Sequence, residues 1–128
     1  MIVVDASVVI AHLVSADVHH ERAVDFFRTH LDARLAMHSL TMTEVLVAPS
    51  RAGRSTAAVQ ALRALGIEEW MPPPSSALRL AELRAQTALR LPDCCVLDAA
   101  LELGAALATF DERLGAAASA LGVEVPLA

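Results

Sequence analysis

The most constraining feature of this sequence is the regular alternation of short apolar runs with longer amphipathic stretches. The first run, Met1–Val4, is rich in β-branched residues and ends abruptly at Asp5, which is typical of a buried parallel strand. Further strands are predicted at Arg34–Met37, Ile67–Met71, Ala105–Thr109 and Val123–Val125. Strands that alternate with helices pair in parallel and are covered on both faces. The pattern therefore predicts a three-layer α/β/α fold around a mainly parallel sheet of about four or five strands.

Local signals indicate where the helices between these strands begin and end. Ser39 or Thr41 is expected to cap the third helix, and Thr41 has the spacing of a capping box with Glu44. Gly66 and Gly104 are expected to end helices. The helices are expected over Ala6–Leu13, from His19 to Leu31, from Ser39 or Thr41 to about Ser50, from Arg54 to Leu65, from Ser75 to Leu89, over Asp93–Leu103 and over Asp111–Leu121. No repeat or linker divides the 128 residues, so we expect a single domain over residues 1–128.

Composition excludes several classes of function. All 10 basic residues are arginine, and lysine is absent. This excludes Schiff-base chemistry, a P-loop and a receiver-type phosphorylation site, all of which need a lysine. The net charge of −5 argues against a module that holds nucleic acid by charge alone. It is compatible with an enzyme that uses acidic residues to bind a metal ion.

The cysteines and the hydropathy pattern bear on the compartment. Cys94 and Cys95 are neighbours, which cannot easily reach normal disulfide geometry, so we expect free thiols in a reducing compartment. We find no leader-like segment and no run of 18 apolar residues, and the expectation is a cytoplasmic protein without membrane contact.

Four acidic residues stand at positions that a parallel sheet brings together. Asp5 ends the first predicted strand, and Asp111 follows the Ala105–Thr109 strand by two residues. Asp93 and Glu44 lie in the first turns of helices that begin at the same edge of the sheet. Two unit charges about 5 Å apart repel by roughly 3 kcal/mol at an effective dielectric constant near 20. A divalent cation with oxygen ligands, Mg²⁺ or Mn²⁺, would relieve that repulsion.

Three of these four acidic residues also have a purely structural explanation. Asp93 after a proline and Glu44 in a capping box favour their helix N-termini without any chemistry, and Asp111 is a plausible cap of the last helix. A carboxylate at the end of a four-residue apolar run has no such role, so Asp5 favours a functional interpretation.

The order and spacing of these motifs resemble a known family. The chain resembles the PIN-domain nucleases, and specifically the VapC-type toxins of bacterial VapBC toxin–antitoxin pairs. The resemblance extends from one end of the chain to the other. It rests on Ile2-Val3-Val4-Asp5-Ala6-Ser7, His20-Glu21-Arg22-Ala23, Thr41-Met42-Thr43-Glu44-Val45-Leu46, Leu91-Pro92-Asp93-Cys94-Cys95-Val96-Leu97 and Ala108-Thr109-Phe110-Asp111-Glu112-Arg113-Leu114.

The resemblance implies a Mg²⁺-dependent endoribonuclease, with Mn²⁺ as a plausible substitute. Asp5, Glu44, Asp93 and Asp111 fall on the family's catalytic acidic positions, and all of these except Glu44 are the expected metal ligands. Ser7 and Thr109 match hydroxyl residues that support the site. The metal would position a water for in-line attack on a phosphodiester and stabilise the charge that develops.

Other residues are assigned more loosely. Asp98 departs from the family pattern, which prefers a small residue there. It lies about 140° around the helix from Asp93, so we expect it to support the site from behind the metal ligands or to lie on a dimer surface. Four arginines flank the predicted cleft and are candidates to bind RNA phosphate, because a guanidinium group donates two parallel hydrogen bonds. They are Arg51, Arg54, Arg84 and Arg90.

The resemblance also implies partners. We expect a specific structured RNA, tRNA or rRNA, as substrate, a cognate VapB-type antitoxin and a homodimer. DNA contact is expected only through the antitoxin complex. The alternative is a PIN-like module that binds RNA or protein without catalysis. A phosphatase with a nucleophilic aspartate is excluded, because Ser7 stands where the second aspartate is needed and lysine is absent.

Overall fold

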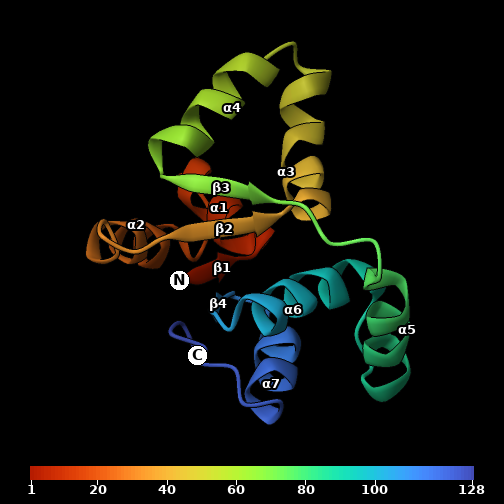
Figure 1. Ribbon diagram of the computed structural model, residues 1–128. Helices are drawn as coiled ribbons and strands as arrows, with labels where there is room; N and C mark the ends of the chain where they lie inside the picture. The colour runs from red at the N-terminus through yellow and green to blue at the C-terminus, as the bar shows by residue number, and fades with distance from the viewer.

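The computed structural model describes residues 1–128 and contains four strands and seven helices (Figure 1). The strands are β1 (Ile2–Val4), β2 (Leu35–His38), β3 (Ile67–Trp70) and β4 (Ala106–Ala108). The helices are α1 (Ala6–Leu13), α2 (His20–Thr29), α3 (Ser39–Arg51), α4 (Ser55–Ala64), α5 (Ser76–Gln86), α6 (Leu91–Leu103) and α7 (Glu112–Ala120). No helix combines the length and the apolar character that a bilayer crossing requires.

The four strands form one parallel sheet in the order β3-β2-β1-β4. The chain moves outward from β1 through β2 to β3 and then returns to place β4 on the other side of β1. Strand order therefore reverses between β1 and β4, where Val4 pairs with Ala108. In open α/β sheets, ligands bind outside the carboxyl ends of the strands at such a reversal. Asp5 and Thr109 directly follow the two strand ends at this point.

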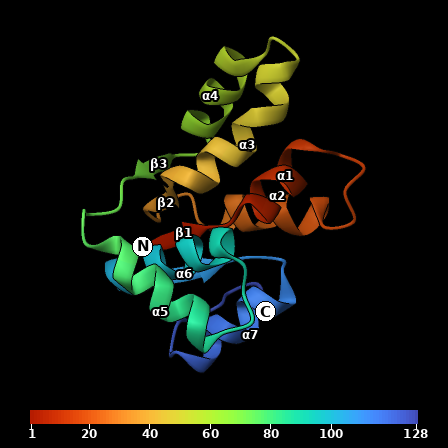
Figure 2. The same ribbon diagram turned by 90° about the vertical axis from the view of Figure 1, so that its right-hand side faces the viewer.

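Apolar side chains pack on both faces of the sheet, which confirms the predicted three layers. Within β1, Ile2 and Val4 belong to one core cluster and Val3 to the other, because successive side chains of a strand point to opposite faces. The first cluster includes buried residues of α1 and α2, and the second includes those of α5, α6 and α7. Figure 2 shows these two groups of helices on opposite sides of β1. The sheet is thereby covered, and its C-terminal edge remains for a site.

The remaining two helices form a hairpin that stands beside the sheet. In Figures 1 and 2, α3 and α4 extend together away from the other helices. The helix α3 continues through Pro49 to Arg51, slightly beyond the predicted end, and Gly53 turns the chain with a φ of +69°. Only a residue without a Cβ adopts this left-handed conformation readily.

The predicted cap of α3 is wrong. The N-cap is His38, whose Nδ1 accepts a hydrogen bond from the backbone N–H of Leu40 at 2.9 Å. Ser39 is already helical, and Thr41 is buried with its Oγ1 lacking a hydrogen-bond partner. Thr41 is buried where the start of α3 packs against the sheet, and it is not the N-cap. The capping-box spacing between Thr41 and Glu44 is therefore coincidental.

Two other predicted boundaries also changed. The segment Val123–Val125 is not a strand, although Glu124 accepts one hydrogen bond from the Leu107 N–H at 2.9 Å. A single bond does not make a ladder, so the sheet has four strands. The helix α5 ends at Gln86 because Thr87 is extended, with its Oγ1 donating to the carbonyl of Leu83 at 2.7 Å.

Candidate active site

Asp5 is held by two hydroxyl groups that come from distant parts of the chain. Its Oδ2 accepts hydrogen bonds from Ser7 Oγ and Thr109 Oγ1, both at 2.8 Å. The side chains of Asp5 and Thr109 are buried, and the two residues are 104 positions apart in the sequence. Pairing of β1 with β4 brings them together. Both hydroxyls bind the same oxygen, Oδ2, and the other oxygen of Asp5, Oδ1, accepts no hydrogen bond from the protein.

The two hydroxyls also organise the loop after β4. Ser7 Oγ accepts from the N–H of Phe110 at 3.1 Å, and Thr109 Oγ1 accepts from the N–H of Asp111 at 3.0 Å. The same Thr109 therefore donates to one acidic residue and fixes the backbone of another. Ser7 and Thr109 lie where the sequence predicts supporting residues.

Asp111 caps the N-terminus of α7. Its Oδ1 accepts from the N–H groups of Arg113 at 2.9 Å and Leu114 at 3.1 Å. The structural explanation considered for Asp111 is thus realised through one oxygen. Its Oδ2 accepts no hydrogen bond from the protein, so capping leaves half of the carboxylate available.

Glu44, Asp93 and Asp111 line one cavity of about 420 Å³. They come from α3, from the first turn of α6 and from the N-cap of α7. Asp5 does not line the cavity, but it lies close enough to raise the pKa of both Glu44 and Asp93. The four predicted acids are therefore neighbours at the C-terminal edge of the sheet. The other lining residues are Ala88, Leu89, Arg90, Pro92 and Arg113.

The electrostatics of the cavity favour uptake of positive charge. Burial is the main cause of the raised pKa of Glu44, and repulsion from Asp5 and Asp93 adds to it. Burial also raises the pKa of Asp93, with further contributions from Asp111 and Asp5, while a backbone hydrogen bond and the charge of Arg90 act in the opposite direction. Neighbouring carboxylates thus make ionisation of Glu44 and Asp93 harder, and a bound cation or proton would relieve this repulsion.

The residues present fit a hard divalent cation by their donor chemistry. Carboxylate oxygens are the ligands that Mg²⁺ and Mn²⁺ prefer, and Asp5 and Asp111 each keep one oxygen free of protein hydrogen bonds. No three acidic, histidine or cysteine side chains are gathered tightly enough to chelate an ion as they stand. Glu44, Asp93 and Asp111 share a cavity with Asp5 close by, and the four acids do not form a closed chelate.

Comparison with known proteins identifies the family. The model of the PIN domain family matches residues 2–120, which is nearly the whole chain. The chain belongs to the PIN domain family. No curated protein sequence matches it.

Solved structures with the same fold resemble this PIN domain over most of its length. A toxin–antitoxin complex from Klebsiella pneumoniae is 22% identical, with a TM-score of 0.69 and 88% of each chain covered. FitAcB from Neisseria gonorrhoeae is 18% identical, with a TM-score of 0.72, and the match covers 98% of this chain and 96% of the other. FitAB bound to a DNA fragment is also 18% identical, with a TM-score of 0.75 and coverage of 98% and 93%. At these identities the likeness establishes the shared fold.

The predicted phosphate-binding arginines of this PIN domain separate in the structure. Arg90 is the N-cap residue of α6 and lines the acidic cavity. Arg54, the N-cap residue of α4, lines a neighbouring groove that also contains Glu44. Arg51 and Arg84 are exposed and line neither of these two hollows. Sequence reasoning missed Arg113, which lines the cavity; the available signal was its place two residues after Asp111.

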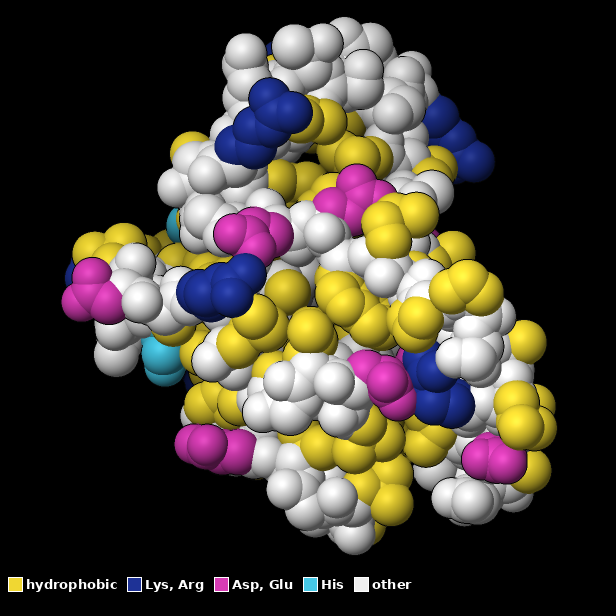
Figure 3. All heavy atoms as spheres, viewed as in Figure 1, with side chains coloured by type: hydrophobic (Ala, Val, Ile, Leu, Met, Phe, Trp, Pro, Cys, Tyr) yellow, Lys and Arg dark blue, Asp and Glu magenta, His cyan; other side chains and the backbone are white.

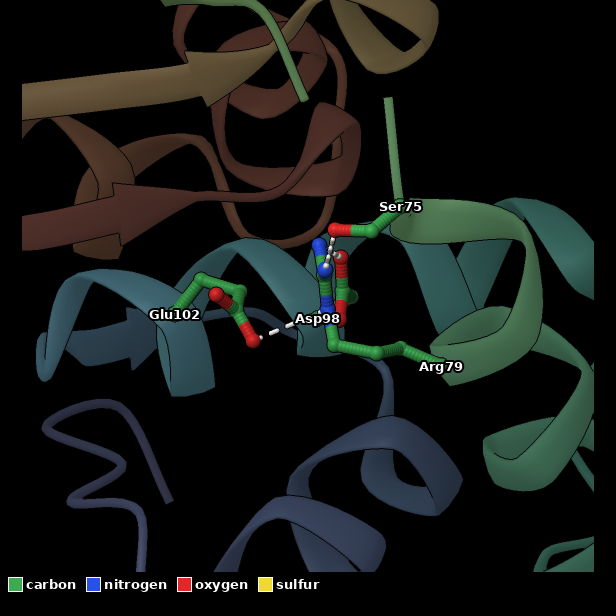
Figure 4. Close-up of polar contacts among 4 residues, drawn as sticks. All are labelled: Ser75, Arg79, Asp98 and Glu102. Carbon is green, nitrogen blue, oxygen red and sulfur yellow. Dashed lines mark hydrogen bonds and ion pairs between the residues drawn. The ribbon is translucent and has the colours of Figure 1, made fainter. Parts of the chain in front are cut away.

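The expected role of Asp98 is wrong. Its carboxylate is 2% exposed, so it lies on no surface, and both oxygens bind Arg79 of α5 at 3.0 and 3.1 Å (Figure 4). Arg79 also contacts Glu102 at 2.8 Å and Ser75 at 3.1 Å. A buried carboxylate needs a partner, and the packing of α5 against α6 supplies one. Asp98 therefore joins two helices and does not support the acidic cavity.

A second hollow of about 650 Å³ adjoins the cavity at Asp111. His19 and Arg22 flank it together with Phe110, whose ring stacks on His19 with centroids 4.4 Å apart. The guanidinium carbon of Arg22 lies 5.1 Å from the centroid of the same ring. These contacts tie the start of α2 to the loop after β4. They involve residues that the sequence pattern alone did not connect.

Proposed function

We propose that this PIN domain is a metal-dependent endoribonuclease and acts as the toxin of a type II toxin–antitoxin system of the VapBC kind. The observation that carries the proposal is the meeting of Asp5, Glu44, Asp93 and Asp111 at the reversal of strand order, where the last three line one cavity and Asp5 lies close to it. Four mutually repelling carboxylates weaken a fold unless they have a ligand. The cavity also contains two guanidinium groups, which suits a phosphodiester as the second ligand.

In the proposed reaction, water attacks the phosphorus of an RNA phosphodiester in line with the leaving oxygen. Asp5, Asp93 and Asp111 would hold Mg²⁺, or Mn²⁺, which when bound neutralises charge on the phosphate. Ser7 and Thr109 keep the Asp5 carboxylate in one orientation through hydrogen bonds to Oδ2. Glu44, with its raised pKa, is suited to accept the proton that the attacking water loses. The leaving oxygen takes a proton from solvent.

An antitoxin partner is supported by an apolar groove that leads to the cavity. The groove has a volume of about 550 Å³ and runs between α1, α3 and α4. Glu44 lines both the groove and the acidic cavity, so a segment seated in the groove would end at the candidate active site. In Figure 3, hydrophobic side chains are visible in the opening between α3 and α4. The apolar lining includes Ile10, Leu13, Val14, Val45, Pro49, Ala57 and Ala61.

The relatives support the same partner class. Two of the similar structures are complexes: one is a toxin–antitoxin complex, and the other is FitAB bound to a DNA fragment. We propose by analogy that this chain forms a homodimer, is neutralised by a VapB-type antitoxin, and reaches DNA only through that antitoxin. Free thiols at Cys94 and Cys95 are in keeping with a cytoplasmic site of action.

The experiment that tests the proposed function is cleavage of total bacterial tRNA and rRNA by the purified protein. Reactions with Mg²⁺ or Mn²⁺ are compared with reactions in EDTA, and wild type is compared with Asp93→Asn. Discrete fragments that need the metal and vanish in the variant are the expected result. Metal binding without cleavage of any RNA would instead favour a non-catalytic module that binds RNA or protein.

A further inference from the structure

Arg113 occupies a position where a helix disfavours positive charge. It is the second residue of α7, directly after the cap Asp111 and Glu112. The N-terminus of a helix carries partial positive charge, so a cation in the first turn is unfavourable there. Its backbone N–H serves the cap, bonding Asp111 Oδ1 at 2.9 Å, but an N–H can come from any residue except proline. The helix therefore gives no reason for an arginine side chain at this position.

The guanidinium group of Arg113 has no partner within the protein. The ion pairs of the chain use Arg28, Arg34 and Arg79. Arg113 makes no ion pair, and no side-chain hydrogen bond of its own is formed. Arg113 is exposed to solvent, and it is one of the residues that line the acidic cavity. An unpaired cation that lines the same cavity as three carboxylates, in an unfavourable helical position, is the kind of local conflict that function explains.

Arg90 is in a similar situation on another wall of the cavity. It is the N-cap residue of α6 and makes no side-chain capping bond. Its charge acts on Asp93, which lowers the pKa of that carboxyl against the other influences. Two arginines from two helix N-termini thus line the hollow that contains Glu44, Asp93 and Asp111.

The balance of charge indicates what these arginines bind. Four carboxylates against two guanidinium groups leave the ionised site with an excess of two negative charges. One divalent cation would cancel this excess, and because neither guanidinium group is paired with a carboxylate, both keep their N–H donors for an anion. A phosphodiester of the RNA backbone is such an anion, and its two non-bridging oxygens match the paired N–H groups of arginine.

We propose that Arg113, together with Arg90, binds the non-bridging oxygens of the phosphodiester at which RNA is cut. This inference rests on the proposed function and adds Arg113 as a substrate-contacting residue of the same cavity. The two side chains would hold the phosphate between α6 and α7, with the carboxylates on the remaining wall.

The first test measures binding and does not depend on turnover. Fluorescein-labelled total bacterial tRNA is titrated in Mg²⁺ with proteins that all carry Asp93→Asn, and fluorescence anisotropy is read at several salt concentrations. Arg113→Gln should weaken binding about tenfold and reduce the slope of log K against log[salt] by about 0.7–0.9, the value for one lost phosphate contact. Arg113→Lys should keep most of the slope, because the charge remains.

The matched control is Arg63→Gln. Arg63 is exposed in the last turn of α4, makes no ion pair and does not line the cavity. If Arg113→Gln binds tRNA with the affinity and salt slope of the Arg63→Gln control, the inference is overturned, whether or not the protein cleaves RNA. A thermal unfolding midpoint equal to that of wild type, measured for each variant, establishes that the comparison is between folded proteins.

The second test asks whether both arginines contact the same phosphate. In the otherwise native protein, Arg113→Gln and Arg90→Gln should each lower kcat/KM ten- to hundredfold, and the double variant should lose less than the product of the two. Fully multiplicative losses would refute a shared phosphate. If no protein cleaves RNA but Arg113→Gln still loses affinity and salt slope, the nuclease proposal fails while the phosphate site stands.

Discussion

Replacing Thr109 with valine tests whether the hydroxyl groups organise the acidic site. Valine has nearly the same shape, so the substitution removes a donor to Asp5 and an acceptor for the Asp111 N–H with little change in volume. Thr109 is 3% exposed, and water therefore cannot easily replace the lost donor. A hydrogen bond to a charged group contributes about 1.5–3 kcal/mol. Ser7 still donates to the same oxygen, which places the expected loss near 2 kcal/mol.

The assay is equilibrium unfolding in guanidinium chloride, supported by thermal melting in EDTA. For a chain of this length, a loss of about 2 kcal/mol lowers the Tm by roughly 6–10 °C. Thr109→Ser is the matched control, because it keeps the hydroxyl and loses only a methyl group. We expect it to retain most of the stability and the RNA cleavage of the wild type, whereas Thr109→Val loses cleavage about tenfold or more. A valine variant as stable and active as the serine variant would refute the assigned role of the hydroxyl.

The remaining predictions concern protons, metal and the groove. Burial and neighbouring carboxylates raise the pKa of Glu44 and Asp93, so the metal-free fold binds these protons more tightly than the unfolded chain does. This contribution to the stability of the metal-free fold is fully present below the ordinary pKa values, 4.5 for Glu44 and 3.8 for Asp93. It is lost as pH rises through the raised pKa of each group. Asp93→Asn and Glu44→Gln should therefore melt a few degrees higher than wild type at pH 7 in EDTA, an advantage that disappears at pH 3.5; equal melting at both pH values would contradict the sign. Saturating Mg²⁺, at about 100 times its Kd, should stabilise wild type by about 2.7 kcal/mol and leave Asp5→Asn unchanged, as followed by calorimetry. Leu13→Glu, in the apolar groove, should weaken the complex with a co-expressed antitoxin more than tenfold, while Val18→Glu, at a more exposed apolar position outside the groove, should not; equal retention of the antitoxin by both variants in a pull-down would show that the groove is not the contact.

Much of the fold follows from local pattern. The apolar run that ends at Asp5, the helical spacing of Ala6–Leu13 and the glycine at 104 each indicated an element, and α1 has the predicted bounds. Gly104 ends α6 with a φ of +59°, as a left-handed cap requires. These features depend on neighbours within a few residues, and that is why sequence spacing was sufficient.

Other local signals were overruled by packing. The Thr41–Glu44 spacing predicts a capping box, yet Thr41 is buried and His38 supplies the cap. The apolar segment Val123–Val125 has the composition of a strand, but it makes a single bond to β4. Which of several local alternatives forms depends on the free energy of burying the whole surface, and no short window contains that information.

The sequence by itself placed Asp5 at a strand end and Asp93 and Asp111 at helix starts, and it predicted these three acids and Glu44 as one group. The predicted first-turn position of Glu44 is wrong, because α3 begins at Ser39 and Glu44 lies in its second turn. Only the tertiary structure decided how the four acids meet. Pairing of β1 with β4 joins Asp5 to Thr109 across 104 residues, and packing of α5 on α6 gives Asp98 to Arg79. It also leaves Arg113 unpaired on the cavity wall. The physical reason is that residue type and spacing fix chemistry and local conformation, whereas the partners of a charged group depend on contacts between segments that are remote in the chain.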